Sequence, residues 1–249
     1  ARERLGAKDV RSARFKFHAQ TSGIDLTRQQ PLNNIARVTV QAMAGIFGGL
    51  QSLHTDAYDE ALSCPSEFGA RIAVATQNIL REEAHLTDVI DPLGGSYYVE
   101  ALTDRIEQEV QDYFRRIEML GGVVPAIEAG FMQREIAEAA FRYQQEVDSG
   151  ERIIVGVNDY VTAELPAIPI LKLDPTGYER QLARLHRVRA ERDEAAVQAS
   201  LSKLTDAARD DQNNLMYPIL DAVNAYATLG EITGVFRQTF GEYQEPVFF

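Results

Sequence analysis

Two short segments with period-two alternation, separated by one amphipathic helix, constrain the fold of this chain more than any other feature. Residues 13–21 (ARFKFHAQT) and 50–55 (LQSLHT) each place polar side chains on one face of a predicted strand. These polar residues are Arg14, Lys16, His18 and Gln20 in the first segment, and Ser52, His54 and Asp56 in or directly after the second. With a helix predicted over roughly 33–47, the run forms a right-handed βαβ unit with parallel strands.

The polar faces indicate which kind of parallel sheet this unit belongs to. Strands of most parallel sheets are apolar on both faces, because helices or core cover both sides. A (β/α)8 TIM barrel whose bore holds a ligand would satisfy the two polar faces instead. Because two units cannot close a barrel of eight strands, residues 1–100 are predicted to be its last βα units, in the α/β class. The front half must then come from missing sequence or another chain.

The remainder, residues 101–249, is predicted to be mainly helical, with a linker near 161–177. Apolar spacing and turn residues predict helices over about 103–120, 133–148, 178–193 and 192–207, after an earlier helix over 66–84 that begins at Ser66. A C-terminal helical pair surrounds the turn DQNNLMYP. The β-branched run IIVGVNDY (153–160) predicts a buried strand, and the proline-punctuated residues 164–175 predict an extended connector.

Composition excludes several classes of function. The formal charge is −12, from 37 acidic and 25 basic residues, so the chain repels phosphate backbones and anionic lipid surfaces. The sequence has no apolar stretch of about 18 residues that would predict a membrane span. Cys64 is the only cysteine, which excludes an internal disulfide and a cysteine-built zinc site. The sequence therefore predicts a cytoplasmic protein that binds neither nucleic acid nor membrane and holds no metal of its own.

Candidate chemistry lies along the two polar faces. His18 and Gln20 point the same way, and their donors and acceptors suit carbonyl and hydroxyl groups better than a metal. The alternative is that His18 is an ordinary histidine near a strand end. Asp56 repeats the pattern on the second strand, and Glu60 follows at the C-terminal end, where active residues gather in such barrels. Carboxylates there suit ribose hydroxyls, although DAYDEAL can also be a solvated helix start.

Longer strings of the sequence resemble a known enzyme family. FHAQTSGIDLTRQQPLNNIARVTVQAMAG, GGLQSLHTDAYDEALSCPSEFGARIAVATQNIL and DPLGGSYYVEALTDRI are similar to the adenosylcobalamin-dependent acyl-CoA mutases, the family of methylmalonyl-CoA mutase. The similarity continues through GGVVPAIEAGFMQREIAEAAFRYQQEVDSGERIIVGVNDY and the LKLDP and RLHRVRAERD segments, so it covers nearly the whole chain. On this resemblance the chain is the C-terminal part of a large, catalytic subunit.

The resemblance implies an acyl-CoA threaded along the barrel and adenosylcobalamin (coenzyme B12), which starts a radical carbon-skeleton rearrangement. The implied reaction is foremost that of (R)-methylmalonyl-CoA to succinyl-CoA, with isobutyryl-CoA or 2-hydroxyisobutyryl-CoA as alternative substrates. The resemblance also implies roles for individual residues: catalysis and substrate contact by His18 and Gln20, further substrate contact by Gln51 and Ser52, and cofactor contact by Gly23, Asp56, Glu60 and Ser63. Asp56 departs from the asparagine that is commoner in methylmalonyl-CoA mutases, which leaves the acyl group open.

The same resemblance implies that the chain is inactive alone. It contains no DxHxxG motif for cobalt ligation, so cobalamin is expected on a separate domain or small subunit. The residues that clamp the acyl carboxylate in the family are expected upstream of Ala1, in the front half of the barrel. The C-terminal EPVFF, with no sequence leading towards a cobalamin domain, favours a large subunit. The alternative from another class is a non-catalytic helical interaction module.

Overall fold

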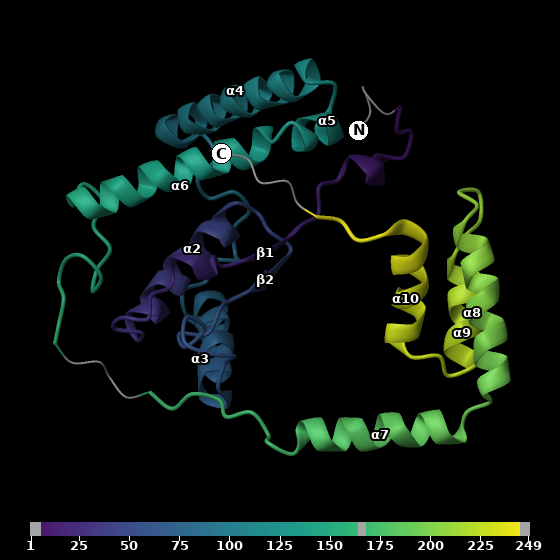
Figure 1. Ribbon diagram of the computed structural model, residues 1–249. Coiled ribbons are helices and arrows are strands. Elements are labelled where there is room, and N and C mark those ends of the chain that lie inside the picture. Colours follow the sequence, from purple (N-terminus) through teal and green to yellow (C-terminus); the bar gives the residue numbers. More distant parts are fainter. Residues whose placement is uncertain (1–5, 164–167, 245–249) are drawn as a thin grey trace. The chain divides into compact units, whose positions relative to one another are not determined.

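The computed structural model describes residues 6–163 and 168–244 (Figure 1). The predicted connector therefore lies partly outside the described residues, at 164–167, and EPVFF lies outside them entirely. The chain divides into two compact units, one up to Leu171 and the other from Lys172 to the last described residue, Gln244. This division falls inside the linker predicted near 161–177, whereas the predicted boundary at residue 100 stays a prediction. None of the helices in the described ranges is long and apolar enough to cross a membrane.

The first unit contains the predicted strand, helix and strand (Figure 1). β1 (His18–Gln20), α2 (Asn33–Phe47) and β2 (Ser52–His54) follow in this order, and the two strands pair in parallel. The register sets His18 opposite Ser52, Ala19 opposite Leu53 and Gln20 opposite His54. In both strands the outer residues are exposed and the middle residue is half-buried. The predicted alternation is therefore confirmed over three residues of each segment and not over the whole of 13–21 and 50–55.

α3 (Glu67–Asn78) begins where the sequence predicts, because Ser66 caps its first turn. The Ser66 hydroxyl accepts a hydrogen bond from the Gly69 amide at 3.0 Å and donates to Asp59 at 2.6 Å. A π-helical turn (Ile79–Glu83) follows α3 and extends nearly to the predicted end of this helix. α3 packs against α2, so the helices that flank β2 in the sequence share one small core.

Replacing Ser66 with alanine should lower the local stability of α3 by about 1–3 kcal/mol. The substitution removes the N-cap and one of the two donors to the buried Asp59 carboxylate. Hydrogen–deuterium exchange of peptides from α3 measures the change. Ser96→Ala is the matched control, because Ser96 precedes α4 without a side-chain capping bond. An equal effect of both substitutions would contradict the capping role.

Three further α-helices lie in the described part of the first unit: α4 (Tyr97–Met119), α5 (Val123–Glu128) and α6 (Phe131–Ser149). α4 begins earlier than predicted and ends before Gly121 and Gly122, whose φ angles of 95° and 106° let the chain reverse. An ion pair between Arg116 and Glu135 links α4 to α6, and the Tyr113 hydroxyl donates to the same carboxylate at 2.8 Å. An ion pair and a hydrogen bond thus join α4 to α6.

Residues 153–160 do not form the predicted buried strand. They form turns with one isolated bridge, between Val155 and Asp159. Gly156 has a φ of 81°, outside the strand region. The Asn158 side chain accepts from the Ile154 amide and donates to the Arg152 carbonyl, each at 2.7 Å. Asparagine therefore bonds the backbone groups that a neighbouring strand would have bonded, and this outweighs the β-branched composition.

The second unit contains, in its described part, α7 (Gly177–Glu191), α8 (Glu194–Ala208), α9 (Met216–Asn224) and α10 (Leu229–Phe240). The helices predicted over 178–193 and 192–207 are confirmed. A C-terminal pair, α9 and α10, is also present, but both helices follow the predicted turn, because α9 begins within it at Met216. α8, α9 and α10 enclose an apolar core made of Leu204, Ala222, Ile232 and Val235. α10 starts with a capping box, in which Thr228 and Glu231 exchange side-chain and backbone hydrogen bonds.

Candidate functional site

The outward side chains of β1 and β2 form one patch, called here the polar face: His18, Gln20, Ser52 and His54. His18 Nδ1 lies 2.7 Å from Ser52 Oγ across the two strands. All of these side chains are exposed. The parallel register therefore brings together residues that the sequence placed on two separate predicted strands.

Asp56 lies beneath the polar face and is closed to solvent, with a side chain that is 0% exposed. Its Oδ1 accepts from Gln20 Nε2 and its Oδ2 accepts from the Thr21 hydroxyl, both at 2.8 Å. The Asp56 amide donates to the Thr21 oxygen at 2.9 Å. His54 Nε2 lies 3.7 Å from Asp56 Oδ1. The structure thus directs Asp56 towards Gln20, away from the surface where the sequence analysis expected it.

Glu60 lies in the turn after β2, close to Asp56 and Gly23. Burial raises the pKa of Glu60, and the neighbouring Asp56 raises this pKa further. A Cβ on residue 23 would lie 2.9 Å from Glu60 Oε1, so the glycine leaves the room that this carboxyl occupies. Residues 56–59 are buried and form no helix. The alternative of a solvated helix start at DAYDEAL is therefore wrong, because Asp56 is held by hydrogen bonds inside the core.

The structure adds an acidic residue that sequence reasoning missed. Asp59 is 0% exposed, and its Oδ2 accepts from the Ser66 amide and hydroxyl at 2.9 and 2.6 Å. Asp59 Oδ1 has no hydrogen-bond partner among the described residues and packs against Gly69, where a Cβ would lie 2.4 Å away. The sequence signal for burial of Asp59 was the capping Ser66 with Gly69 after it. Two adjacent acidic residues such as Asp59 and Glu60 ordinarily face water, so this signal was outweighed. Asp59 thus anchors the turn that carries Glu60 to the start of α3.

Three other predicted site residues lie outside the polar face. Gln51 is tied to backbone groups, since its Oε1 accepts from the Phe17 amide at 2.8 Å and its Nε2 donates to the Gly49 carbonyl at 2.7 Å. Ser63 is half-buried and donates to the Cys64 carbonyl at 2.9 Å. Gly23 begins a short 3-10 turn (Gly23–Asp25). The substrate and cofactor contacts expected of these residues stay predictions.

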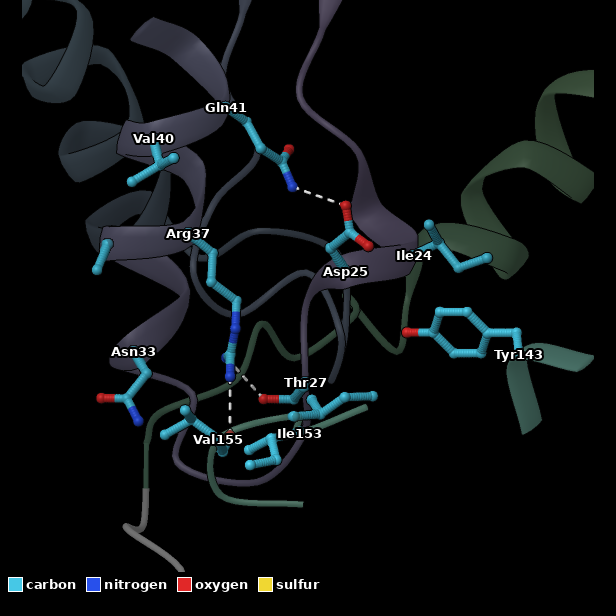
Figure 2. Close-up of a pocket in the computed structure, with 12 residues that line it drawn as sticks. Ile24, Asp25, Thr27, Asn33, Arg37, Val40, Gln41, Tyr143, Ile153 and Val155 are labelled. Atoms are coloured by element: carbon cyan, nitrogen blue, oxygen red, sulfur yellow. Dashed lines mark hydrogen bonds between the residues drawn. The ribbon is translucent and has the colours of Figure 1, made fainter. Parts of the chain in front are cut away.

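A separate hollow of about 660 Å³ lies against α2 (Figure 2). Much of its lining is apolar, from residues that include Ile24, Val40, Tyr143, Ile153 and Val155. Arg37 crosses it, donating to the Thr27 hydroxyl at 2.9 Å and to the Val155 carbonyl at 2.8 Å. None of the sequence-predicted site residues is among those that line it. The hollow and the polar face are therefore distinct features of the first unit.

The sequence of the chain matches known proteins over nearly its whole length. The family model described as methylmalonyl-CoA mutase matches residues 1–242. The chain is 44% identical over 249 residues to the 2-hydroxyisobutanoyl-CoA mutase large subunit of Aquincola tertiaricarbonis. It is 45% identical over 243 residues to the methylmalonyl-CoA mutase of Escherichia coli K12 and 40% identical over 238 residues to the mitochondrial methylmalonyl-CoA mutase of Homo sapiens.

The matches cover 99%, 97% and 95% of this chain, respectively. The chain is much shorter than these relatives, since it spans 44%, 34% and 32% of their lengths. The match nonetheless runs through both compact units, including the strands that form the polar face and the turn that carries Glu60. It confirms the resemblance drawn from the residues, and the chain belongs to the methylmalonyl-CoA mutase family.

Proposed function

We propose that this chain is the C-terminal part of the large subunit of an adenosylcobalamin-dependent acyl-CoA mutase. The polar face carries the proposal, because His18, Gln20 and Ser52 stand exposed on a parallel sheet, where strands are ordinarily apolar on both faces. Their donors and acceptors suit a ligand with carbonyl and hydroxyl groups. The names of the relatives supply the ligand class, since each relative is an acyl-CoA mutase.

The two strands would be the last strands of a (β/α)8 barrel. Among the described residues each strand has a single neighbour, so further strands can extend the sheet at both edges. The relatives are longer than this chain, and the front half of the barrel would come from earlier sequence or from another chain. The words "large subunit" in the name of the A. tertiaricarbonis relative support a heteromeric arrangement with a cobalamin-binding small subunit.

The surroundings of Glu60 fit a cofactor that carries a ribose. The carboxyl is half-buried, and Gly23 beside it presents no side chain. The two oxygens of a carboxylate accept hydrogen bonds, which matches the donors of a pair of ribose hydroxyls. Glu60, with Gly23 and Ser63, would hold the adenosyl part of adenosylcobalamin, whose cobalt a separate domain or subunit would ligate. When bound, this group supplies the radical chemistry of the carbon-skeleton rearrangement.

The polar face would hold the acyl-CoA. His18 and Gln20 would contact the reacting acyl group. Ser52, together with Gln51 next to the polar face, would contact the CoA arm. Because Ser52 engages His18 Nδ1, the Nε2 atom is the one left for the ligand. The proposed reaction interconverts (R)-methylmalonyl-CoA and succinyl-CoA. A 2-hydroxyisobutyryl-CoA or isobutyryl-CoA substrate is the alternative, supported by the similarity to the A. tertiaricarbonis subunit.

Native mass spectrometry of the protein as isolated from its source tests this proposal. We expect the chain within a longer polypeptide or bound to chains that carry the front half of the barrel and cobalamin, and we expect that assembly to isomerise an acyl-CoA. A chain that stays alone at 27.8 kDa and leaves the absorption spectrum of adenosylcobalamin unchanged would overturn the proposal. That result would favour a non-catalytic helical interaction module.

Replacing Glu60 with alanine in the assembled enzyme should weaken adenosylcobalamin binding about tenfold or more, since hydrogen bonds to a carboxyl are lost. Titration of the cofactor, followed by its absorption spectrum, gives the dissociation constant. Glu67→Ala is the control, because the Glu67 side chain is 92% exposed at the start of α3. Equal dissociation constants for the wild type and Glu60→Ala would rule out the proposed contact.

A further inference from the structure

Thr21, Asp56 and Gln20 form a series of hydrogen bonds with a fixed direction. The Asp56 amide donates to the Thr21 oxygen at 2.9 Å, and the Thr21 hydroxyl donates in turn to Asp56 Oδ2 at 2.8 Å. Gln20 Nε2 donates to the other carboxylate oxygen, Oδ1, at 2.8 Å. Thr21 is buried and the Asp56 side chain is 0% exposed. Water therefore does not compete for the hydrogen bonds between Thr21 and Asp56.

The direction of this series decides which atom of Gln20 faces outward. An ionised carboxylate only accepts hydrogen bonds, so the amide nitrogen of Gln20 must face Asp56. The amide oxygen, Oε1, is on the opposite side of the amide group and has no hydrogen-bond partner within the described ranges. Because Gln20 is exposed, the polar face presents a hydrogen-bond acceptor at this position.

We propose that Asp56 is a positioning residue, which holds the Gln20 side chain so that its amide oxygen faces outward and accepts a hydrogen bond. The ligand group that binds there is then a hydroxyl. This inference rests on the proposed function. Within that function the hydroxyl has two sources, the acyl group of a 2-hydroxyacyl-CoA or the ribose of the adenosyl group. Asp56 acts through Gln20 and not on the ligand, because its own carboxylate is enclosed.

Asparagine at position 56 should reverse this arrangement. The Thr21 oxygen still accepts from the backbone amide of residue 56, so its hydroxyl still needs an acceptor. Among the described residues it donates to the side-chain oxygen at position 56, and the asparagine oxygen takes that place. The asparagine nitrogen then faces Gln20, which must turn its own amide so that Oε1 accepts and Nε2 faces outward. Asp56→Asn therefore exchanges an acceptor for a donor on the polar face at nearly constant shape.

A second substitution should restore the acceptor. Gln20→Glu in the Asp56→Asn background replaces the turned amide with a carboxylate, which has no donor to present. One carboxylate oxygen accepts from the asparagine nitrogen and the other faces outward. The double variant also keeps the total charge, because one carboxylate is exchanged for another. Restoration by this pair would distinguish a change of polarity from general damage to the site.

The test compares matched ligands on the full mutase assembly. Dissociation constants are measured for 2-hydroxyisobutyryl-CoA against isobutyryl-CoA, and for adenosylcobalamin against analogues that lack one ribose hydroxyl. We expect the wild type to favour the hydroxyl-bearing ligand in at least one comparison. Asp56→Asn should lower that preference roughly tenfold to a hundredfold, and the double variant should recover it. If the substitutions change the preference between the two acyl-CoA ligands, the bound hydroxyl belongs to the acyl group. If they change the preference between adenosylcobalamin and its analogues, the bound hydroxyl belongs to the ribose.

Other results would overturn the inference. One is a preference for the hydroxyl-bearing ligand that Asp56→Asn leaves unchanged. The other is a variant that binds both ligands more weakly by the same factor in every comparison, which a purely structural role would produce. Where Asp56→Asn fails to assemble, Gln20→Met removes the acceptor and leaves Asp56 and Thr21 in place; a hydroxyl preference that survives Gln20→Met contradicts the inference. A wild-type assembly that binds neither acyl-CoA nor adenosylcobalamin would instead overturn the proposed function, and this inference with it.

Discussion

Replacing Leu204 with alanine is expected to lower the free energy of unfolding of the second unit by about 2–5 kcal/mol. Leu204 is 0% exposed and packs with Ala222, Ile232 and Val235. Because Ala222 is small and also fully buried, the lost methyl groups leave a cavity that the three helices can fill only by moving. A domain is stable by only about 5–15 kcal/mol in total, so the variant should lose much of the protection of α8, α9 and α10.

Hydrogen–deuterium exchange of peptides from residues 194–240 measures this loss, since the chain contains no tryptophan to report on it by fluorescence. Leu229→Ala is the matched control, because Leu229 is 78% exposed at the start of α10. It should change the local stability by less than about 0.5 kcal/mol. If both substitutions accelerate exchange equally, Leu204 does not occupy the core described for these helices.

Much of the fold could be predicted because local patterns decide many of its elements. Ser66 stands at a helix N-cap, and Gly121 follows the last turn of α4, so both ends follow from the chemistry of single residues. The strand predicted over 153–160 is wrong because a β-branched run forms a strand only where a neighbouring strand supplies hydrogen bonds. Asn158 supplies those bonds instead. The barrel itself depends on strands beyond the two that are described, and stays a proposal.

The candidate site shows the same division between local and tertiary causes. Period-two alternation predicted that His18 and Gln20 share a face, and the parallel register then brings Ser52 to His18. Alternation could not predict the inward direction of Asp56, since this residue follows β2, where the strand pattern ends. Nor could it predict the burial of Asp59, which depends on donors from Ser66. The enclosed aspartates follow from tertiary contacts, whereas the exposed residues follow from the strands.

Replacing Glu231 with glutamine should lower the free energy of unfolding of the second unit by about 2–4 kcal/mol near neutral pH. Arg192, whose side chain is only 4% exposed, donates to both Glu231 oxygens at 2.8 Å. The same carboxylate accepts from the Thr228 amide and hydroxyl at the start of α10. Glutamine keeps the shape but turns an amide nitrogen towards Arg192 or Thr228. It therefore leaves a buried guanidinium without the opposite charge from α10.

The effect of this substitution should depend on pH. Arg192 lowers the pKa of Glu231 from its ordinary 4.5 to about 2. Because the pKa is lower in the folded state, the carboxylate stabilises the fold fully above about pH 4.5, and this contribution is lost as the pH falls towards 2. The stability difference between the wild type and Glu231→Gln should thus shrink on acidification through this range. Glu194→Gln, at a 57% exposed partner of the same guanidinium, should cost less than about 1 kcal/mol. A difference for Glu231→Gln that stays constant with pH would mean that its charge does not stabilise α10.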